Sequence, residues 1–359
     1  MHIDGIDLTY RPQLPVHRDR YGIGIVGTGE IVKNCHLPAY QMAGFRVVGI
    51  SSPNPAKEGL AQEYGIPYFT SDYHDLIIRD DVEVVDISVP PHLQADIAIF
   101  AAENGKHLLC QKPLATTFED AVRIVKAAER NHVKIVVNQN GRWDPAIQAA
   151  KKIIAAGLIG KPILATMELR FRMQWQQYYL QYRDQYSRMM ILSMSIHHLD
   201  QFRFLFGDPL WVWASATKYE NQNWPGDTIA VYSLEYPDGF IATSLDDGFT
   251  WTSDYGIDYR FEGLEGVVKG KIGWPNLIPS TLSFFSQKLC PVWYTPEFQE
   301  KWFPHAFMST MGDLLSAIEN DSEPDLSGKD NLRTLQVVFA AYKSVAEKRA
   351  VKPEEIQAE

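Results

Sequence analysis

Two glycines near the N-terminus have the spacing of a phosphate-binding turn. In the stretch IGIVGTGEIVKNCHLPAY, Gly27 and Gly29 follow an apolar run and precede a helical pattern. The first glycine of such a turn allows a sharp bend, and the second allows a pyrophosphate to approach the N–H groups of the helix N-terminus. Val32 stands where a third glycine would favour close helix–strand packing. We expect a nucleotide site here; the alternative is an ordinary strand–turn–helix connection.

The end of the second predicted strand would hold the ribose of a nucleotide. An acidic side chain there binds the 2′-hydroxyl of NAD, whereas an arginine accommodates the 2′-phosphate of NADP. Here FRVVGI runs into Ser51, Ser52 and Pro53, so the sequence has neither residue type at this point. The choice between the two cofactors stays open, and the same stretch also suits a loop that caps the next helix.

These residues need a parallel sheet that gathers the strand ends at one edge. Apolar runs and helical patterns alternate as far as Asn138, and strand–helix–strand units of this length predict a doubly wound parallel sheet. The expected strands are Gly22–Val26, Phe45–Ile50, Val82–Val89, His107–Cys110 and Lys134–Val137, and the expected helices include Asn54–Tyr64, Leu93–Glu103 and Thr117–Asn131.

The pattern changes after Asn138. A helix is expected over Pro145–Ala156, followed by longer β-rich runs such as ILATMELRFR and DTIAVYSLEYP, with one helix over Ser195–Leu205. This predicts an α+β domain with a large, mostly antiparallel open sheet. Two late helices are expected at roughly 306–320 and 329–348. The fold class is therefore α/β, a Rossmann domain joined to this second domain.

Composition limits the classes of partner. The length of 359 residues argues for two domains. The net charge of −10 argues against nucleic acid or an anionic membrane as the main partner. Its three cysteines show no paired spacing, so a reducing compartment fits best. The N-terminal residues have no apolar core of a signal peptide, and no apolar run approaches the length of a membrane span. We expect a cytoplasmic protein.

Several segments together resemble the Gfo/Idh/MocA family of NAD(P)-dependent sugar and polyol oxidoreductases. They are GIVGTGEIVKNCHLPA, VDISVPPHLQADIAIFAAENGKHLLCQKPLATT, NGRWDPAIQAAKKIIAAGLIGKPI and SIHHLDQFRFLFG, of which GKHLLCQKPLA is the most specific. The resemblance spans nearly the whole chain. It implies an N-terminal extension (1–20), a Rossmann domain (21–140), a substrate-binding and oligomerisation domain (141–330) and a C-terminal helix returning towards the nucleotide domain (331–359).

The family ends its fourth strand in a Glu-Lys-Pro triplet. The resemblance implies that Lys112 reaches the substrate hydroxyl and the nicotinamide ribose, and that Pro113, often after a cis bond, aims it. Glutamate is replaced by Gln111 in this chain. Gln111 can form hydrogen bonds but carries no charge, so it cannot raise the pKa of Lys112 by ion pairing. The alternative for Lys112 is an exposed lysine at a strand end.

The second family signature implies a catalytic histidine, His197, with Asp200 three residues later. The acid expected four residues before it is Ser193 here, and one-turn spacing would place Ser193, His197 and Asp200 on one helix face. Imidazole suits acceptance of a hydroxyl proton because its pKa lies near neutrality. A buried structural histidine is the alternative for His197, as it is for its neighbour His198.

The stretch RFRMQWQQYYLQYRDQYSRMM suits stacking on a sugar ring through Trp175, or else an oligomer-contacting loop. The chain offers no H-E-x-x-H and no cysteine cluster, so we expect no metal site. The expected cofactor-binding residues are Gly27, Thr28, Gly29, Glu30, Ile31, Ser51, Ser52, Pro90, Gln111, Lys112 and Asn138. The expected substrate-binding residues are Lys112, Arg142, Trp175, Ser193, His197 and Asp200, with Lys112 and His197 catalytic.

The function expected from these features is an NAD(P)-dependent dehydrogenase of a sugar or polyol, with NAD preferred over NADP. Replacement of both signature acids, at Gln111 and Ser193, motivates a second hypothesis, a nucleotide-binding sensor without turnover. A third keeps the cofactor tightly bound, as in an oxidoreductase between sugars, a lyase or an epimerase. The resemblance also implies a homodimer or homotetramer formed through sheet faces.

Overall fold

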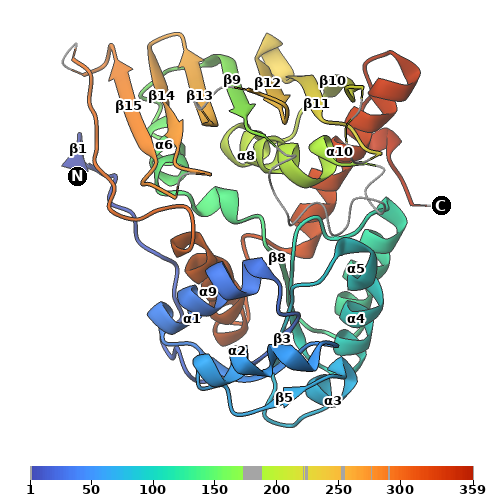
Figure 1. The fold of residues 1–359 in the computed structure, drawn as a ribbon. Coiled ribbons are helices and arrows are strands. Elements are labelled where there is room, and N and C mark those ends of the chain that lie inside the picture. The colour runs from blue at the N-terminus through green and yellow to red at the C-terminus, as the bar shows by residue number, and fades with distance from the viewer. Residues whose placement is uncertain are drawn as a thin grey trace. The chain divides into compact units, whose positions relative to one another are not determined.

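The computed structural model describes residues 2–172, 188–220, 222, 225–251, 255–275, 277–289 and 292–358. The chain forms two compact units (Figure 1). The parallel-sheet unit comprises Pro12–Asn140, Phe303–Leu332 and Ala358–Glu359, and the open-sheet unit comprises Met1–Arg11, Gly141–Trp302 and Arg333–Gln357. The C-terminal part of the chain is thus divided. Phe303–Leu332 belongs to the parallel-sheet unit, whereas Arg333–Gln357, with most of the last long helix, belongs to the open-sheet unit.

The parallel-sheet unit contains a six-stranded sheet in the order β5-β4-β3-β6-β7-β8, with all neighbours parallel. Its central strands are buried on both faces, which explains their continuous apolar runs. The strands are β3 (Gly22–Val26), β4 (Arg46–Ser51), β5 (Phe69–Thr70), β6 (Val84–Ile87), β7 (His107–Cys110) and β8 (Ile135–Val137). The helices are η1 (Val32–His36), α1 (Leu37–Ala43), η2 (Pro55–Lys57), α2 (Glu58–Glu63), α3 (Tyr73–Ile77), α4 (Pro91–Glu103), α5 (Phe118–Arg130) and α9 (His305–Glu319).

The open-sheet unit contains a seven-stranded sheet in the order β10-β11-β12-β9-β13-β14-β15. All neighbours are antiparallel except β12 and β9. The strands are β9 (Pro162–Arg170), β10 (Trp211–Thr217), β11 (Ile229–Glu235), β12 (Ile241–Asp247), β13 (Gly256–Gly263), β14 (Gly266–Ile272) and β15 (Thr281–Ser286). The helices are η3 (Asn140–Trp143), α6 (Pro145–Ala155), η6 (Met190–Ser195), α8 (Ile196–Phe206), η7 (Pro237–Gly239), α10 (Gly328–Glu347) and η8 (Pro353–Glu355), and the hairpin β1 (His2–Ile3) and β2 (Ile6–Asp7) completes the set.

One face of this sheet is buried and the other is open. Buried and less buried residues alternate along β11 and β12, as expected for a sheet with helices on one side only. Helix α6 packs on β14 and β15, and η6 packs on β11. The predicted fold class, a Rossmann-type parallel sheet plus a mostly antiparallel open sheet, is therefore confirmed. Within the described residues, no helix has both the length and the hydropathy of a membrane span.

Candidate active site

The carboxyl ends of four parallel strands meet at one edge of the sheet. Strand register pairs Val26 with Ile87, Ile87 with Cys110, and Cys110 with Val137. The residues that follow these ends therefore lie in a row along that edge. They include Gly27, Ser88, Gln111 and Asn138.

The glycine turn after β3 gives its two glycines different roles. Gly27 has φ of +115°, and a Cβ there would lie 2.2 Å from the carbonyl oxygen of Ser88, so the fold itself requires glycine. A Cβ on Gly29 would meet no heavy atom of the described residues within 4 Å. The backbone at Gly29 therefore has open space over it.

The predicted helix after this turn contains a π-helical segment. Residues 30 and 31 are α-helical, η1 follows, and α1 begins at Leu37. Val32, at the position of the usual third glycine, is fully buried at the start of η1. The Glu30 side chain is exposed and accepts a hydrogen bond from Asn34 Nδ2 at 2.9 Å. Ile31, which is less buried than Val32, is the N-cap of η1.

Ser51, the last residue of β4, and Ser52, just after it, form hydrogen bonds with the glycine turn. Thr28 Oγ1 donates to Ser52 Oγ at 2.9 Å, and the N–H of Gly27 donates to the carbonyl of Ser51 at 3.0 Å. Asn54 then caps η2 by accepting from the N–H of Ala56. The stretch can therefore cap a helix and still lie where the ribose of a nucleotide is expected.

Lys112 is the second residue after β7 and is half-buried. Its bond to Pro113 is cis, and the Pro113 carbonyl accepts from Nε2 of the buried Gln94 at 2.7 Å. Burial lowers the pKa of Lys112 to about 8, because desolvation disfavours the ammonium. The lysine therefore titrates close to the physiological range. Pro90, another expected cofactor residue, is the N-cap of α4.

A buried polar cluster behind Gln111 was not predicted from the sequence. Asp86 Oδ2 lies 2.6 Å from His36 Nδ1 and accepts from the Tyr40 hydroxyl at 2.7 Å, and Oδ1 accepts from Ser88 Oγ at 2.8 Å. Gln111 Nε2 lies 2.6 Å from His36 Nε2. The available signal was Asp86 itself, an acid within the otherwise apolar strand VEVVDISV.

Three buried side-chain amides have no hydrogen-bond partner among the described residues. They belong to Asn138 and Gln139, directly after β8, and to Asn331 in the first turns of α10. The Leu326 carbonyl accepts from the Val137 N–H at 2.9 Å, so the segment that leads into α10 runs beside β8. Of the three, only Asn138 was predicted as a site residue. An unpaired buried amide costs roughly 1–3 kcal/mol, which favours a bound polar group at this edge.

In the open-sheet unit, His197 lies on α8 with its ring edge-to-face with Trp302, at a centroid distance of 5.2 Å. Its neighbours Ser195 and His198 both bind the buried Asp246 of β12: Ser195 Oγ donates to Oδ2, and His198 Nδ1 lies 3.0 Å from Oδ1. Ser193 lies in the π-helical η6, so the one-turn spacing assumed between Ser193 and His197 does not apply there.

The start of η6 is also held by a carboxylate that the sequence did not single out for this role. Asp227 accepts from the N–H groups of Met189 and Ile191 at 2.8 and 3.0 Å. Tyr342 on α10 donates its hydroxyl to Asp227 at 3.1 Å. These contacts fix the turn that carries Ser193.

Arg142 and Asp200 bind one another. The guanidinium donates through Nε to Oδ2 at 2.7 Å and through Nη2 to Oδ1 at 2.6 Å, and both side chains are buried. Thr334 also donates to Oδ1, at 2.7 Å. The structure thus assigns both residues an anchoring role inside the open-sheet unit. Trp175 lies outside the described residues.

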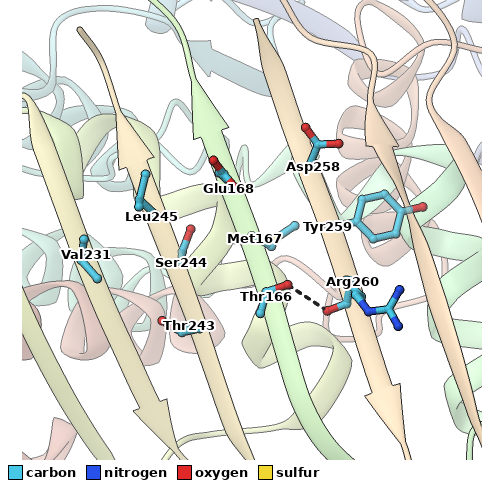
Figure 2. A pocket seen from close by; sticks show the side chains of 10 residues that line it. All are labelled: Thr166, Met167, Glu168, Val231, Thr243, Ser244, Leu245, Asp258, Tyr259 and Arg260. Carbon is cyan, nitrogen blue, oxygen red and sulfur yellow. Dashed lines mark hydrogen bonds between the residues drawn. The ribbon is translucent and has the colours of Figure 1, made fainter. Parts of the chain in front are cut away.

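A hollow of about 370 Å³ lies over the middle of the open sheet (Figure 2). Among the described residues that line it, none is an expected cofactor- or substrate-binding residue. Across β9 and β13, Glu168 and Asp258 occupy paired positions, and Thr166 Oγ1 donates to the Arg260 carbonyl at 3.5 Å. The lining residues are Thr166, Met167, Glu168, Val231, Thr243, Ser244, Leu245, Asp258, Tyr259 and Arg260. Within the described part of the chain, no group of three or more His, Cys, Asp or Glu side chains is arranged to hold a metal ion.

Two family models match consecutive parts of the chain. Residues 21–139 match the oxidoreductase family with an NAD-binding Rossmann fold, and residues 147–269 match the GFO/IDH/MocA C-terminal domain. The chain belongs to the Gfo/Idh/MocA family. Membership confirms the predicted family, and the description of the matched residues 21–139 is that of an NAD-binding Rossmann fold.

Relatives in the Gfo/Idh/MocA family cover nearly the whole chain. D-apiose dehydrogenase of Paraburkholderia graminis is 28% identical over 95% of this chain and 92% of its own length. Inositol 2-dehydrogenase of Rhizobium meliloti is 26% identical over 91% of this chain and 98% of its own. Levoglucosan dehydrogenase, solved with NADH and levoglucosan, shares the fold with a TM-score of 0.83 at 22% identity, over 92% of this chain and 99% of that one.

Proposed function

We propose that the protein is an NAD(P)-dependent dehydrogenase that oxidises a hydroxyl of a sugar or polyol, or reduces the matching carbonyl. The observation that carries this proposal is the edge of the parallel sheet, where the open glycine turn, Lys112 and unpaired amides lie in the row of strand ends. Relatives of similar length that are named as sugar and polyol dehydrogenases support the substrate class.

The residues of this edge fit the cofactor. Open space over Gly29 leaves room for a pyrophosphate at the helix N-terminus. The unpaired amides of Asn138 and Gln139 offer donors and acceptors to a polar ring substituent. When bound, the nicotinamide supplies the hydride acceptor or donor. The remaining proposed contacts are Thr28, Glu30, Ile31, Ser51, Ser52, Pro90 and Gln111.

NAD is proposed as the preferred cofactor. The four residues after β4's last apolar position, SSPN, carry no cationic side chain to pair with a 2′-phosphate. The polar groups at this point are the hydroxyls of Ser51, Ser52 and Thr28, of which Thr28 donates to Ser52. Uncharged hydroxyl groups suit a neutral ribose. Titration of both cofactors against protein fluorescence tests this preference.

Lys112 and His197 are the proposed catalytic residues. Lys112, as an ammonium, donates a hydrogen bond to the reacting oxygen and so orients the hydroxyl. His197 accepts the hydroxyl proton as the carbon–hydrogen bond breaks, and returns it in the reverse direction. Burial of His197 beside Trp302 keeps the imidazole from bulk water. Ser193, Arg142, Asp200 and Trp175 remain proposed substrate-site residues, although Arg142 and Asp200 would act through their mutual anchor.

The test is a screen of aldoses, polyols and keto sugars, followed at the absorbance band of the reduced nicotinamide. We expect turnover of at least one substrate. We also expect the turnover number to fall by more than about a hundredfold in His197→Ala and in Lys112→Ala. If the protein binds cofactor but turns over none of these compounds, and if His197→Ala and Lys112→Ala bind cofactor as the wild type does, the sensor hypothesis is favoured instead. A cofactor that copurifies and survives dialysis would favour the tightly bound alternative.

A second copy of the chain is proposed to cover the open sheet face, giving a homodimer or homotetramer. Leu164 and Ile241 are paired across β9 and β12, and with Leu245 each is more than a third exposed. An apolar row on an otherwise polar sheet favours a protein contact. Leu245→Glu is expected to yield monomers in sedimentation without unfolding, whereas exposed Leu264→Glu, at a hairpin tip, should leave the assembly unchanged.

A further inference from the structure

A continuous hydrogen-bonded chain runs from a buried carboxylate to the backbone of Lys112. Asp86 contacts His36 Nδ1 at 2.6 Å, His36 Nε2 contacts Gln111 Nε2 at 2.6 Å, and Gln111 Oε1 accepts from the Lys112 N–H at 3.2 Å. His36 and Asp86 have no solvent exposure. All four residues belong to the parallel-sheet unit: His36 is on η1, Asp86 is on β6, and Gln111 and Lys112 follow β7.

The atoms of this chain determine where its proton lies. Because Gln111 Oε1 faces the Lys112 N–H, its amide nitrogen faces His36, and an amide nitrogen can only donate. His36 Nε2 must therefore be the unprotonated, accepting nitrogen. The imidazole proton is then on Nδ1 and is donated to Asp86, so His36 is neutral and the negative charge stays on Asp86.

The surroundings keep that charge in place. Asp86 accepts two further hydrogen bonds, from Tyr40 on α1 and Ser88 after β6, and Phe307 of α9 packs on the His36 ring at a centroid distance of 4.9 Å. Burial, reinforced by Asp86, raises the pKa of Tyr40 and of the Cys110 thiol well above neutrality. Both groups therefore stay protonated, and the Tyr40 hydroxyl remains a hydrogen-bond donor to Asp86.

A glutamate at position 111 would reverse this arrangement. A carboxylate can only accept, so His36 Nε2 would have to carry a proton, and the imidazole would become an imidazolium between two carboxylates. The negative charge would then extend to the strand end, adjoining Lys112. A nearby negative charge favours the ammonium form of a lysine.

We propose that Gln111 and His36 are positioning residues for Lys112: they hold its backbone N–H through a neutral, tautomer-fixed chain and keep the carboxylate charge away from the strand end. This rests on the proposed role of Lys112 in the reaction. In Gln111→Glu the alkaline decline of turnover, set by loss of the Lys112 proton, should move upward by about one pH unit.

Two measurements test the chain without any substrate. In protein labelled with ¹⁵N-histidine, the ring-nitrogen chemical shifts of His36 should be those of the neutral Nδ1–H tautomer in the wild type and those of the imidazolium in Gln111→Glu. The rate at which an amine-reactive reagent modifies Lys112, followed against pH by mass spectrometry, should shift to higher pH in Gln111→Glu and keep the wild-type midpoint in Gln111→Met. Identical profiles in all three proteins would overturn the proposal.

A second variant covers the case in which Gln111→Glu does not fold. Gln111→Met keeps the volume and removes the acceptor, so exchange of the Lys112 amide hydrogen should quicken by about tenfold, the value of one hydrogen bond. Unchanged exchange would refute the positioning role. If these substrate-free results appear but no sugar or polyol is turned over, the proposed function fails and the positioning chain stands.

Discussion

Asp246 and His198 join helix α8 to the strand beneath it, with 3.0 Å between Oδ1 and Nδ1. The other oxygen of the same carboxylate accepts from Ser195, and Ser244 donates to Oδ1 at 2.8 Å. Ser195, the N-cap of α8, and His198, in the first turn of α8, lie on either side of His197 in the chain. One buried carboxylate therefore sets the position of the proposed proton acceptor.

Asp246→Asn is expected to lower turnover while leaving cofactor affinity unchanged. The amide offers one acceptor where Asp246 offers two, so one of the bonds that position α8 is lost, at a cost of roughly 1–3 kcal/mol in the free energy of unfolding. Turnover number and melting temperature report the two effects. Asp247→Asn, one residue along on the opposite face, is the control; an equal loss of turnover there would contradict the positioning role.

The glycine turn should separate folding from cofactor binding. Gly27→Ala places a methyl group 2.2 Å from the Ser88 carbonyl oxygen in a left-handed backbone conformation, so it should destabilise the fold by several kcal/mol or prevent expression. Gly29→Ala meets open space in the protein, so its melting temperature should stay near wild type while its affinity for NAD falls by more than about tenfold. Fluorescence titration measures the affinity, and normal binding by Gly29→Ala would exclude this turn as the pyrophosphate site.

The lowered pKa of Lys112, about 8, has opposite effects on turnover and on stability. Above pH 8 the ammonium deprotonates, so alcohol oxidation should decline there if the protonated form orients the hydroxyl. From about pH 8 to the ordinary pKa of 10.5, the folded state binds fewer protons than the unfolded state, so this residue's contribution to stability rises with pH.

Lys112→Met should therefore raise the free energy of unfolding at pH 7 by about 1–3 kcal/mol, and the gain should vanish above about pH 10.5. Chemical denaturation at several pH values measures it. The exposed Lys126→Met provides the comparison and should show no such trend. A destabilised Lys112→Met protein at pH 7 would mean that the ammonium gains more from its surroundings than burial costs it.

Asp144 caps α6 without exposure to solvent, accepting from Ser280 Oγ at 2.5 Å and from the Ala146 N–H at 2.9 Å. Burial raises the pKa of Asp144 to about 6, because desolvation outweighs these hydrogen bonds. Between pH 3.8 and 6 the folded state holds more protons than the unfolded state, so this contribution to stability is lost as pH rises through 6.

Asp144→Asn keeps a side-chain acceptor for the cap and removes the buried charge. Its melting temperature should match or exceed that of wild type at pH 8 and lose the advantage at pH 4. Asp144→Ala lacks the cap and should cost about 1–2 kcal/mol at both pH values. Thermal melts of the three proteins decide the matter, and equal losses in the Asn and Ala variants at pH 8 would show that the charge itself stabilises the cap.

Features encoded by neighbouring residues were predictable from the sequence. The glycine turn follows from a strand, two glycines and a helix within one short stretch, and the alternation of strands and helices was enough to predict the parallel sheet. The open sheet followed from period-two patterns. In each case the local pattern and the tertiary structure agree.

Contacts between distant residues were not predictable in this way. His36 and Asp86 are 50 positions apart, and Arg142 and Asp200 are 58 positions apart, so their pairing depends on the finished packing. The π-helical turns η1 and η6 arise from a one-residue change in hydrogen-bond spacing, which residue type alone does not reveal. The sequence therefore predicted Asp200 as a site residue without revealing its partner.

The Asp200 anchor has a mechanical consequence. The chain passes between the two units after Asn140 and again after Leu332, and the residues just beyond these passages include Arg142 and Thr334. Both side chains bind the same carboxylate. These two connections, among the five at which the chain changes unit, therefore begin at one shared carboxylate inside the open-sheet unit, so loss of Asp200 would release the first residues of both at once.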